Sequence, residues 1–93
     1  MTAKSVKVDC AVPNGSGAAV TLSSFLPAPY TSTDFAFTGY VTAIGTGTIT
    51  LVSQIGTGTL INTQSEYFEG VNLNTISVYG STTGLVLCIG GSH

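Results

Sequence analysis

The amino-acid sequence predicts an all-β fold, a single small antiparallel β-sandwich of about seven strands. Short segments rich in Val, Ile, Thr and Tyr recur along the chain, separated by Gly, Pro or Asn turn signals. The tripeptide Gly-Thr-Gly occurs at residues 45–47 and 56–58, a spacing of 11 residues typical of strands joined by short turns. No segment has helical periodicity over the ~11 residues that a helix needs. A jelly-roll or immunoglobulin-like sandwich is favoured, and a small β-barrel is the alternative.

Alternating hydrophobicity predicts the first strands. In residues 5–12 four apolar side chains alternate with Lys7 and Asp9, which indicates a half-buried strand. Asn14-Gly15 suggests a hairpin turn over residues 13–17, and residues 18–26 are expected to form a second strand. Two prolines in residues 26–34 then hold an irregular stretch extended. We expect this stretch to cross between the sheets and to reach a neighbouring molecule.

Residues 35–61 are expected to form a three-stranded meander with the two Gly-Thr-Gly tripeptides as its turns. Phe37, Val41 and Ala43 share one face of its first strand, and Ile49 and Leu51 share one face of its second. Threonines occupy most of the opposite positions. One face of this sheet is therefore predicted to be core, and the other a threonine-rich outer surface.

The last third of the chain is predicted to contain a loop, two strands and a tail. Residues 62–70 are expected to be a polar loop that carries both glutamates, and residues 71–79 a strand with a bulge or bend near Asn74-Thr75. Residues 80–84 are expected to be a hairpin loop. Residues 85–89 are apolar on both faces, which indicates a central or interface strand, and residues 90–93 are a tail.

The composition bounds the size and the surface of the molecule. The 93 residues are expected to form one domain, 1–93. Only 6% of the residues are charged, against roughly 25% in a typical soluble domain, and there is no arginine. The surface must therefore consist mainly of Thr, Ser, Asn, Gln and Gly. Such a surface has few charges to prevent association with other molecules. We expect a homo-oligomer or a larger assembly, and a monomer with a neutral surface is the alternative.

The same scarcity of charge argues against several partners. Two lysines without arginine cannot neutralise the several phosphates that drive nucleic-acid binding. No apolar run approaches the ~18–20 residues of a membrane span. Lys4 and Lys7 are not followed by the apolar h-region of a signal peptide. We therefore expect neither nucleic acid nor membrane as a partner, and synthesis in the cytoplasm.

No group of residues predicts an enzyme, a cofactor site or a metal site. His93 is the last residue, so a catalytic triad has no anchored imidazole. Glu66 and Glu69 lie on one predicted loop, where two carboxylates seldom enclose a sugar as those of a glycosidase do. Cys10 and Cys88 are too few ligands for zinc. A reducing compartment favours free thiols, and a disulfide is the alternative if the first and last strands are neighbours.

Carbohydrate binding stays an alternative, because many small β-sandwiches stack sugars on exposed aromatic side chains. The chain has no Trp, and four Tyr with four Phe are close to what a core of this size requires. A bound glycan is therefore not favoured. The candidates for such an aromatic platform are Tyr30, Tyr40, Tyr67, Phe68 and Tyr79.

Residues 67–91, YFEGVNLNTISVYGSTTGLVLCIGG, combine an aromatic strand containing Ile-x-Val, a Ser/Thr/Gly turn, a final apolar strand and a Gly-Gly end. This segment resembles small virion proteins of tailed bacteriophages, both head decoration (cement) proteins and the β-sandwich modules of tails and fibres. The resemblance implies a non-enzymatic decoration protein that is located in the virion, assembled in the host cytoplasm, and stabilises a capsid lattice. Its partners would be the major capsid protein or neighbouring subunits. The alternative is a tail, fibre or carbohydrate-binding module that engages host glycans.

Three segments are expected to make the subunit contacts of such a protein: the N-terminus, the proline-containing stretch and the loop with the glutamates. Edge strands that pair between subunits would add directional hydrogen bonds. The expected interface residues are Met1, Thr2, Ala3, Lys4, Pro27, Pro29, Tyr30, Glu66, Tyr67 and Phe68.

Overall fold

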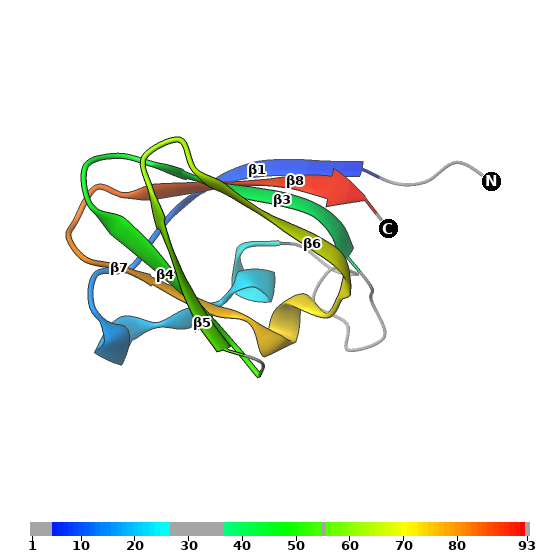
Figure 1. Ribbon diagram of the computed structural model, residues 1–93, viewed down its shortest axis with the longest axis horizontal. Helices are drawn as coiled ribbons and strands as arrows, with labels where there is room; N and C mark the ends of the chain where they lie inside the picture. The colour runs from blue at the N-terminus through cyan, green and yellow to red at the C-terminus, as the bar shows by residue number, and fades with distance from the viewer. Residues whose placement is uncertain (1–4, 27–36, 55, 93) are drawn as a thin grey trace.

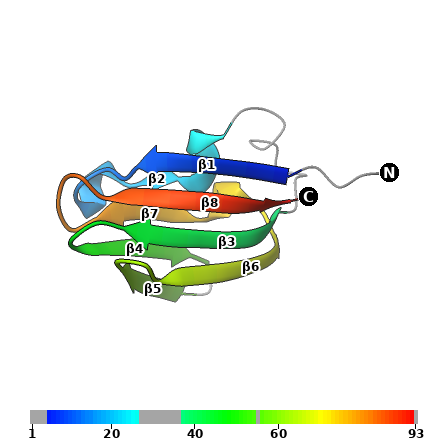
Figure 2. The ribbon, with the colours of Figure 1, turned by 90° about the horizontal axis from the view of Figure 1, so that it is seen from above.

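The computed structural model describes residues 5–26, 37–54 and 56–92, and these residues fold into two four-stranded antiparallel sheets that pack face to face (Figure 1). Three short 3-10 turns join strands, and the described residues include no helix that could cross a membrane. The first sheet contains β1 (Ser5–Ala11), β8 (Val86–Ser92), β3 (Phe37–Ile44) and β6 (Ser65–Val71), in that order (Figure 2). The second sheet contains β2 (Val20–Thr21), β7 (Ser77–Gly80), β4 (Thr48–Ser53) and β5 (Gly56–Ile61).

The strand order of the two sheets is that of a jelly roll. β1 pairs with β8, β2 with β7, β3 with β6 and β4 with β5, so the chain resembles one long hairpin rolled into a sandwich. The predicted all-β sandwich is confirmed, and of the two sandwich types the structure has the jelly roll. The alternative of a closed β-barrel is wrong, because the two sheets remain separate. An eighth strand, β6, was not predicted.

The hydrophobic core lies between the two sheets and follows the predicted alternation. In β3 the residues Phe37, Val41 and Ala43 are buried, and in β4 Ile49 and Leu51 are buried. The predicted central strand is also confirmed, because β8 lies between β1 and β3. The largest fully buried side chains are Phe37, Leu22, Ile49, Leu73, Leu85, Leu87, Ile89, Val41 and Val78.

The predicted meander is wrong, although its strands exist. β3 and β4 belong to different sheets, so the first Gly-Thr-Gly segment carries the chain from one sheet to the other. Gly45 and Gly47 have φ angles of 120° and 142°, which a residue with a side chain rarely adopts. The second Gly-Thr-Gly segment lies inside β5, and the hairpin turn comes just before it, between Ser53 and Gly56. Two successive strands with the same sequence pattern can pair within one sheet or belong to opposite sheets. The spacing of glycines does not distinguish these two arrangements.

The predicted loop at residues 62–70 is also wrong, because most of it is β6. Thr63, with a φ of 72°, and Gln64 make the tight turn that leads into this strand. β6 then pairs with β3 from Thr42 and Ser65 onward. Most of its residues are exposed, because β6 is an edge strand, and this mixture of polar and aromatic residues lacks the alternation of a half-buried strand.

The remaining connections differ from the predictions in one consistent way: they cross between sheets. The turns at residues 13–17 and 80–84 join β1 to β2 and β7 to β8, so neither is a hairpin.

The predicted strand at 18–26 is reduced to β2 and the 3-10 turn η2 (Leu22–Phe25). The bend near Asn74 is confirmed as the 3-10 turn η3 (Leu73–Thr75), which separates β6 from β7. The predicted tail is wrong as far as Ser92, because β8 extends to that residue.

Two glycines let the central strands β3 and β8 pack around the ring of Phe37. A Cβ atom on Gly91 would lie 2.7 Å from the Phe37 ring, and a Cβ atom on Gly39 would overlap the carbonyl oxygen of Gly90. Gly39 and Gly91 are paired across the two strands. Glycine at position 39 therefore lets the two backbones approach closely, and glycine at position 91 also makes room for the fully buried ring of Phe37.

Candidate functional site

The charged side chains of the described residues gather on two strands. Lys7 and Asp9 lie on β1, and Glu66 and Glu69 lie on β6. Both are edge strands of the first sheet. The four strands of the second sheet contain no Asp, Glu, Lys, Arg or His among their described residues.

The outer side of the second sheet therefore forms a neutral face. Strand pairing places threonines of β4 and β5 next to one another, with Thr50 opposite Thr59 and Val52 opposite Thr57. Val52 is 36% exposed and Ile61 is 53% exposed, so the face also presents apolar groups to solvent. We use the term neutral face for Thr21, Thr48, Thr50, Val52, Thr57, Thr59, Ile61, Ser77 and Tyr79.

The edge of the neutral face is open at β5. Among the described strands β5 pairs only with β4, so the N–H and C=O groups of its other side have no partner strand. At the end of β5 the N–H and C=O of Ile61 are hydrogen-bonded to Gln64. Natural proteins protect such edges with charged residues or proline, and the β5 sequence GTGTLI contains neither. The other long edge strands do carry charges, Lys7 and Asp9 on β1 and Glu66 and Glu69 on β6. β5 is thus the least protected edge among the described strands.

A groove of about 420 Å³ separates β5 from β6, at the open side of the sandwich. The buried residues Leu51, Leu60 and Ile76 contribute to its lining. Glu66 and Phe68 pair with core-facing positions of β3, so both side chains point toward this groove. The groove brings together the expected interface residues Glu66, Tyr67 and Phe68. The other expected interface residues, Met1, Thr2, Ala3, Lys4, Pro27, Pro29 and Tyr30, lie outside the described residues.

The outer side of the first sheet carries a pair of exposed tyrosines. Tyr40 of β3 and Tyr67 of β6 are 56% and 48% exposed, and their ring centroids lie 4.9 Å apart with the rings tilted by 52°. They are neighbours because the two residues are paired across the strands. Of the other aromatic candidates, Phe68 points toward the groove and Tyr79 lies on the neutral face. Tyr30 lies outside the described residues.

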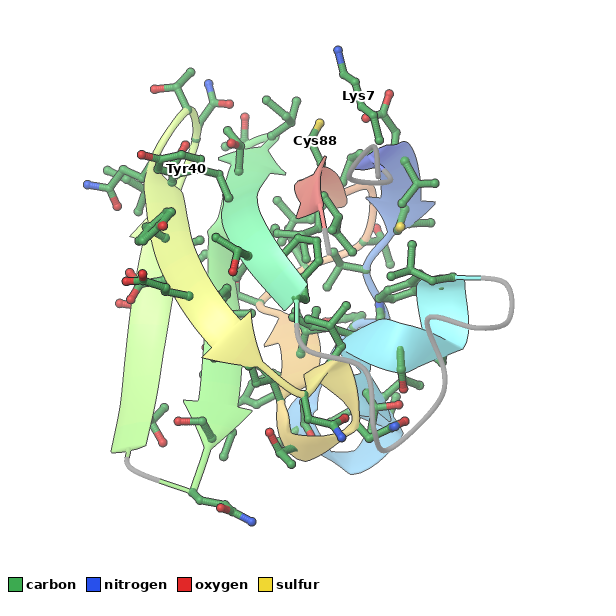
Figure 3. All side chains as sticks on the ribbon, turned by 90° about the vertical axis from the view of Figure 1, so that its right-hand side faces the viewer. Lys7, Tyr40 and Cys88 are labelled. Carbon is green, nitrogen blue, oxygen red and sulfur yellow. The ribbon has the colours of Figure 1, made fainter. Side chains whose placement is uncertain are left out.

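A shallow hollow of about 480 Å³ lies beside this tyrosine pair. Its centre is Gly90 of β8, which is paired with Lys7 on one side and with Tyr40 on the other. Cys88 and Thr42 line the same hollow, each two residues away from Gly90 and Tyr40 along its strand, and they are paired with each other. In Figure 3 the side chains of Lys7, Cys88 and Tyr40 all point to the same outer side of the first sheet. Residues 90–91 were expected to be part of a tail, so the sequence interpretation missed this hollow.

Both cysteines are free thiols, the first of the two alternatives expected from the sequence. β1 and β8 are neighbours, but Cys10 is paired with Leu87 and Cys88 with Asp9. The two thiols therefore point to opposite sides of the sheet, Cys10 into the core and Cys88 outward. Burial, with a smaller contribution from the Asp9 charge, raises the pKa of Cys10 above its ordinary value. A hydrogen bond to the Asp9 carboxylate raises the pKa of Cys88.

The described residues contain no group of three or more His, Cys, Asp or Glu side chains that could hold a metal ion. The described surfaces present hydroxyl groups, exposed aromatic rings, open strand edges and a few separated charges. These groups are suited to noncovalent binding of another molecule. A scan against protein-family models finds no family that matches the chain, and a search of curated proteins finds no matching relative. The geometry of these surfaces is therefore the basis for inferring a function.

Proposed function

We propose that this chain is a non-enzymatic structural protein of a virion, a capsid decoration or cement protein that stabilises a capsid lattice through subunit contacts. The observation that carries the proposal is the neutral face, which spans four strands without a charged group. The jelly-roll architecture adds support by analogy of fold alone, because viral capsid proteins use it among other protein classes.

Such a face is suited to permanent contact with another protein. Covering it removes no charged group from water, so the large desolvation penalty of buried ions does not arise. Its apolar groups, such as Val52 and Ile61, gain roughly 25 cal/mol per Å² that is buried, before the costs of association are subtracted. Its hydroxyl groups exchange hydrogen bonds with water for hydrogen bonds with the partner.

The open edge of β5 gives the contact a direction. A strand from a second copy or from the major capsid protein can add to this edge and pair with its free N–H and C=O groups. The groove next to β5 presents the side chains of Glu66 and Phe68 to the same partner. In this proposal the partners are other virion proteins, and the chain forms a homo-oligomer in the virion.

Sedimentation equilibrium over a concentration series tests the use of the neutral face. The wild-type chain is expected to self-associate. Thr59→Lys places a charge on the face at its open edge strand β5 and is expected to weaken the association constant at least about tenfold, or 1.4 kcal/mol. Ala11→Lys adds the same charge on exposed β1 of the other sheet and is the matched control, which keeps the wild-type constant.

Salt dependence and particle stability complete the test. Because the face carries no charge, the association constant is expected to change less than about twofold between roughly 0.05 and 0.5 M salt. Virus particles that lack this chain are expected to rupture at a lower temperature than complete particles. Equal weakening by Thr59→Lys and Ala11→Lys, or particles whose stability does not depend on this chain, would contradict the proposal.

A further inference from the structure

The hollow on the outer side of the first sheet depends on one glycine whose missing side chain has no structural explanation. Gly90 lies in the interior of β8, where a glycine weakens a strand relative to a residue with a side chain. Its φ is not in the left-handed region that favours glycine. A Cβ atom on Gly90 would have no atom within 4 Å, so close packing does not require a glycine either.

The neighbouring glycines make the contrast clear. Gly39 and Gly91 are required by packing, since a Cβ atom on either would collide with the backbone of the neighbouring strand. An aromatic side chain that lies over a strand glycine can offset the lost packing, but Tyr40 does not lie over Gly90 in this way. Its ring instead contacts Tyr67 in the next strand, at a centroid distance of 4.9 Å. The hollow over Gly90 is therefore open space.

The positions around the hollow are spaced to hold a ring. Lys7, Gly90 and Tyr40 form one row across three adjacent strands. Two strand spacings separate Lys7 from Tyr40, about 10 Å between their Cα atoms. The glycine removes the only side chain that would stand between them. The backbone of Gly90 and Gly91 is the floor, and Cys88 and Thr42 form the next row.

From this arrangement we infer that the hollow over Gly90 is a binding site for a neutral oligosaccharide. The apolar C–H face of a pyranose ring stacks on Tyr40, whose position is supported by Tyr67 on its other side. The ammonium group of Lys7 and the hydroxyl of Thr42 bind the sugar hydroxyls. The hollow is shallow and crosses an open sheet, so it can accept an internal unit of a chain as well as an end.

The charges favour a saccharide over a nucleotide, the other common ligand with a stacking ring. Lys7 is the only cationic side chain among the described residues that line this hollow, and the acidic residue Asp9 is two positions further along the same strand. One lysine cannot neutralise the phosphates of a nucleic acid or a nucleoside triphosphate. A neutral polyhydroxylated ring needs hydrogen-bonding groups and an aromatic surface, and these are the groups present.

This site is distinct from the surface used in the proposed function. The hollow lies on the first sheet, and the neutral face lies on the outer side of the second. Saccharide binding therefore does not depend on assembly through the neutral face. Either proposal can fail while the other holds, since one is measured by sugar binding and the other by association.

Amide chemical shifts of the full chain test the inference, with maltohexaose, cellohexaose, laminarihexaose, xylohexaose and chitohexaose as probes. At least one hexasaccharide is expected to shift the amide signals of Gly90, Gly91 and Tyr40 in a saturable way. The same hexasaccharide is expected to slow alkylation of the Cys88 thiol, which lines the hollow, and not that of Cys10, which points into the core. Adenosine is the competing probe.

Three variants make the result specific. Gly90→Val fills the hollow and is expected to abolish the shifts while it raises the melting temperature by about 2–8 °C, because a strand glycine is replaced. Tyr40→Ala is expected to weaken binding at least tenfold. Tyr79→Ala removes a tyrosine from the neutral face and is expected to leave binding unchanged.

The inference is overturned if none of the hexasaccharides shifts these amides at about 10 mM, a concentration that detects even millimolar dissociation constants. It is also overturned if adenosine shifts them and no hexasaccharide does. Unchanged binding in a folded Gly90→Val variant would place the sugar elsewhere. A Gly90→Val chain that fails to fold leaves the decision to Tyr40→Ala and to Cys88 protection.

Discussion

Phe37 sets the local geometry of the two central strands of the first sheet. Its ring is fully buried and lies where a side chain at Gly91 would otherwise stand, whereas a side chain at Gly39 would meet the backbone of Gly90 and Gly91. The packing of these two strands therefore depends on two paired positions without a Cβ atom, one of which also makes room for the ring. Gly90, next to Gly91 in β8, has no such packing role.

Gly39→Ala is expected to destabilise the fold by at least about 1–3 kcal/mol, because the new methyl group collides with the backbone of Gly90 and the strands must move apart. Gly58→Ala is the matched control. Gly58 is also a strand glycine, but its Cβ atom would meet nothing within 4 Å, so this change is expected to be neutral or stabilising by up to about 1 kcal/mol. Urea denaturation measures both, and an equal loss in the two variants would refute this packing account.

The buried thiol of Cys10 predicts how stability depends on pH. Its pKa is raised in the folded chain, chiefly by burial and then by Asp9, above the ordinary value of 9.0. The folded chain therefore keeps this proton when the unfolded chain has lost it. The contribution of the Cys10 thiol to the free energy of unfolding is complete below pH 9 and is lost as the pH rises above that value.

We expect the free energy of unfolding of the wild-type chain to fall above pH 9, as measured by urea denaturation at a series of pH values. Cys10→Ala is expected to be less stable at neutral pH, and its stability is expected to fall less steeply in the alkaline range. The interpretation does not hold if the two pH profiles stay parallel.

At the scale of elements, the sequence predicted strands better than it predicted their partners. β1, β3 and β4 follow alternation of apolar side chains, which reports the buried face of a strand directly, and β8 begins with a continuous apolar run typical of a central strand. β6 was missed because an edge strand with exposed side chains has the composition of a loop. The same limit applies to Gly90 and Gly91, whose place in β8 depends on pairing with β1 and β3 rather than on their own preferences.

The candidate surfaces were predictable only in part, for a related reason. Threonines opposite the core positions indicated a polar outer face, and this is the neutral face. The open edge of β5 and the hollow over Gly90 depend on which strands are neighbours. Turn signals do not carry that information, because the connections of a jelly roll mostly run between its sheets.

Hydrogen bonds tie the two 3-10 turns η2 and η3 together across the chain. The Ser23 hydroxyl donates to the side-chain oxygen of Asn74, and Ser23 is only 2% exposed. The Asn74 N–H donates to the side chain of Asn72 at 2.9 Å, and the Leu22 N–H donates to the Ile76 carbonyl at 2.9 Å. This network fixes the path that the chain takes from β6 to β7.

Asn74→Ala removes one partner of the buried Ser23 hydroxyl, which keeps the Thr21 hydroxyl at 3.1 Å, and is expected to cost about 0.5–1.5 kcal/mol of stability. Thermal denaturation measures this loss. Gln54→Ala, at an exposed position in the turn after β4, is the control and is expected to change stability by less than about 0.5 kcal/mol. A stable Asn74→Ala variant would mean that the two turns are held by packing alone.

At the scale of the whole molecule, the distribution of charge is uneven between the two sheets. The described charged residues lie on the edges of one sheet, and the strands of the other have none. A charge-free surface with an open strand edge favours association, and charges at the opposite edges disfavour association there. This asymmetry separates the two proposals in space, with protein contacts on the second sheet and sugar binding on the first.

Hydrogen–deuterium exchange of the chain, free in dilute solution and assembled at high concentration, tests the contact surface most directly. The account predicts that assembly slows exchange of the amides of β5, Gly56–Ile61, more than those of any other edge strand. Exchange in β1, at the other edge of the first sheet, is expected to stay unchanged. Protection confined to β1 and β6, or no change at β5 while the chain is assembled, would contradict the claim that the neutral face and its open edge make the contacts.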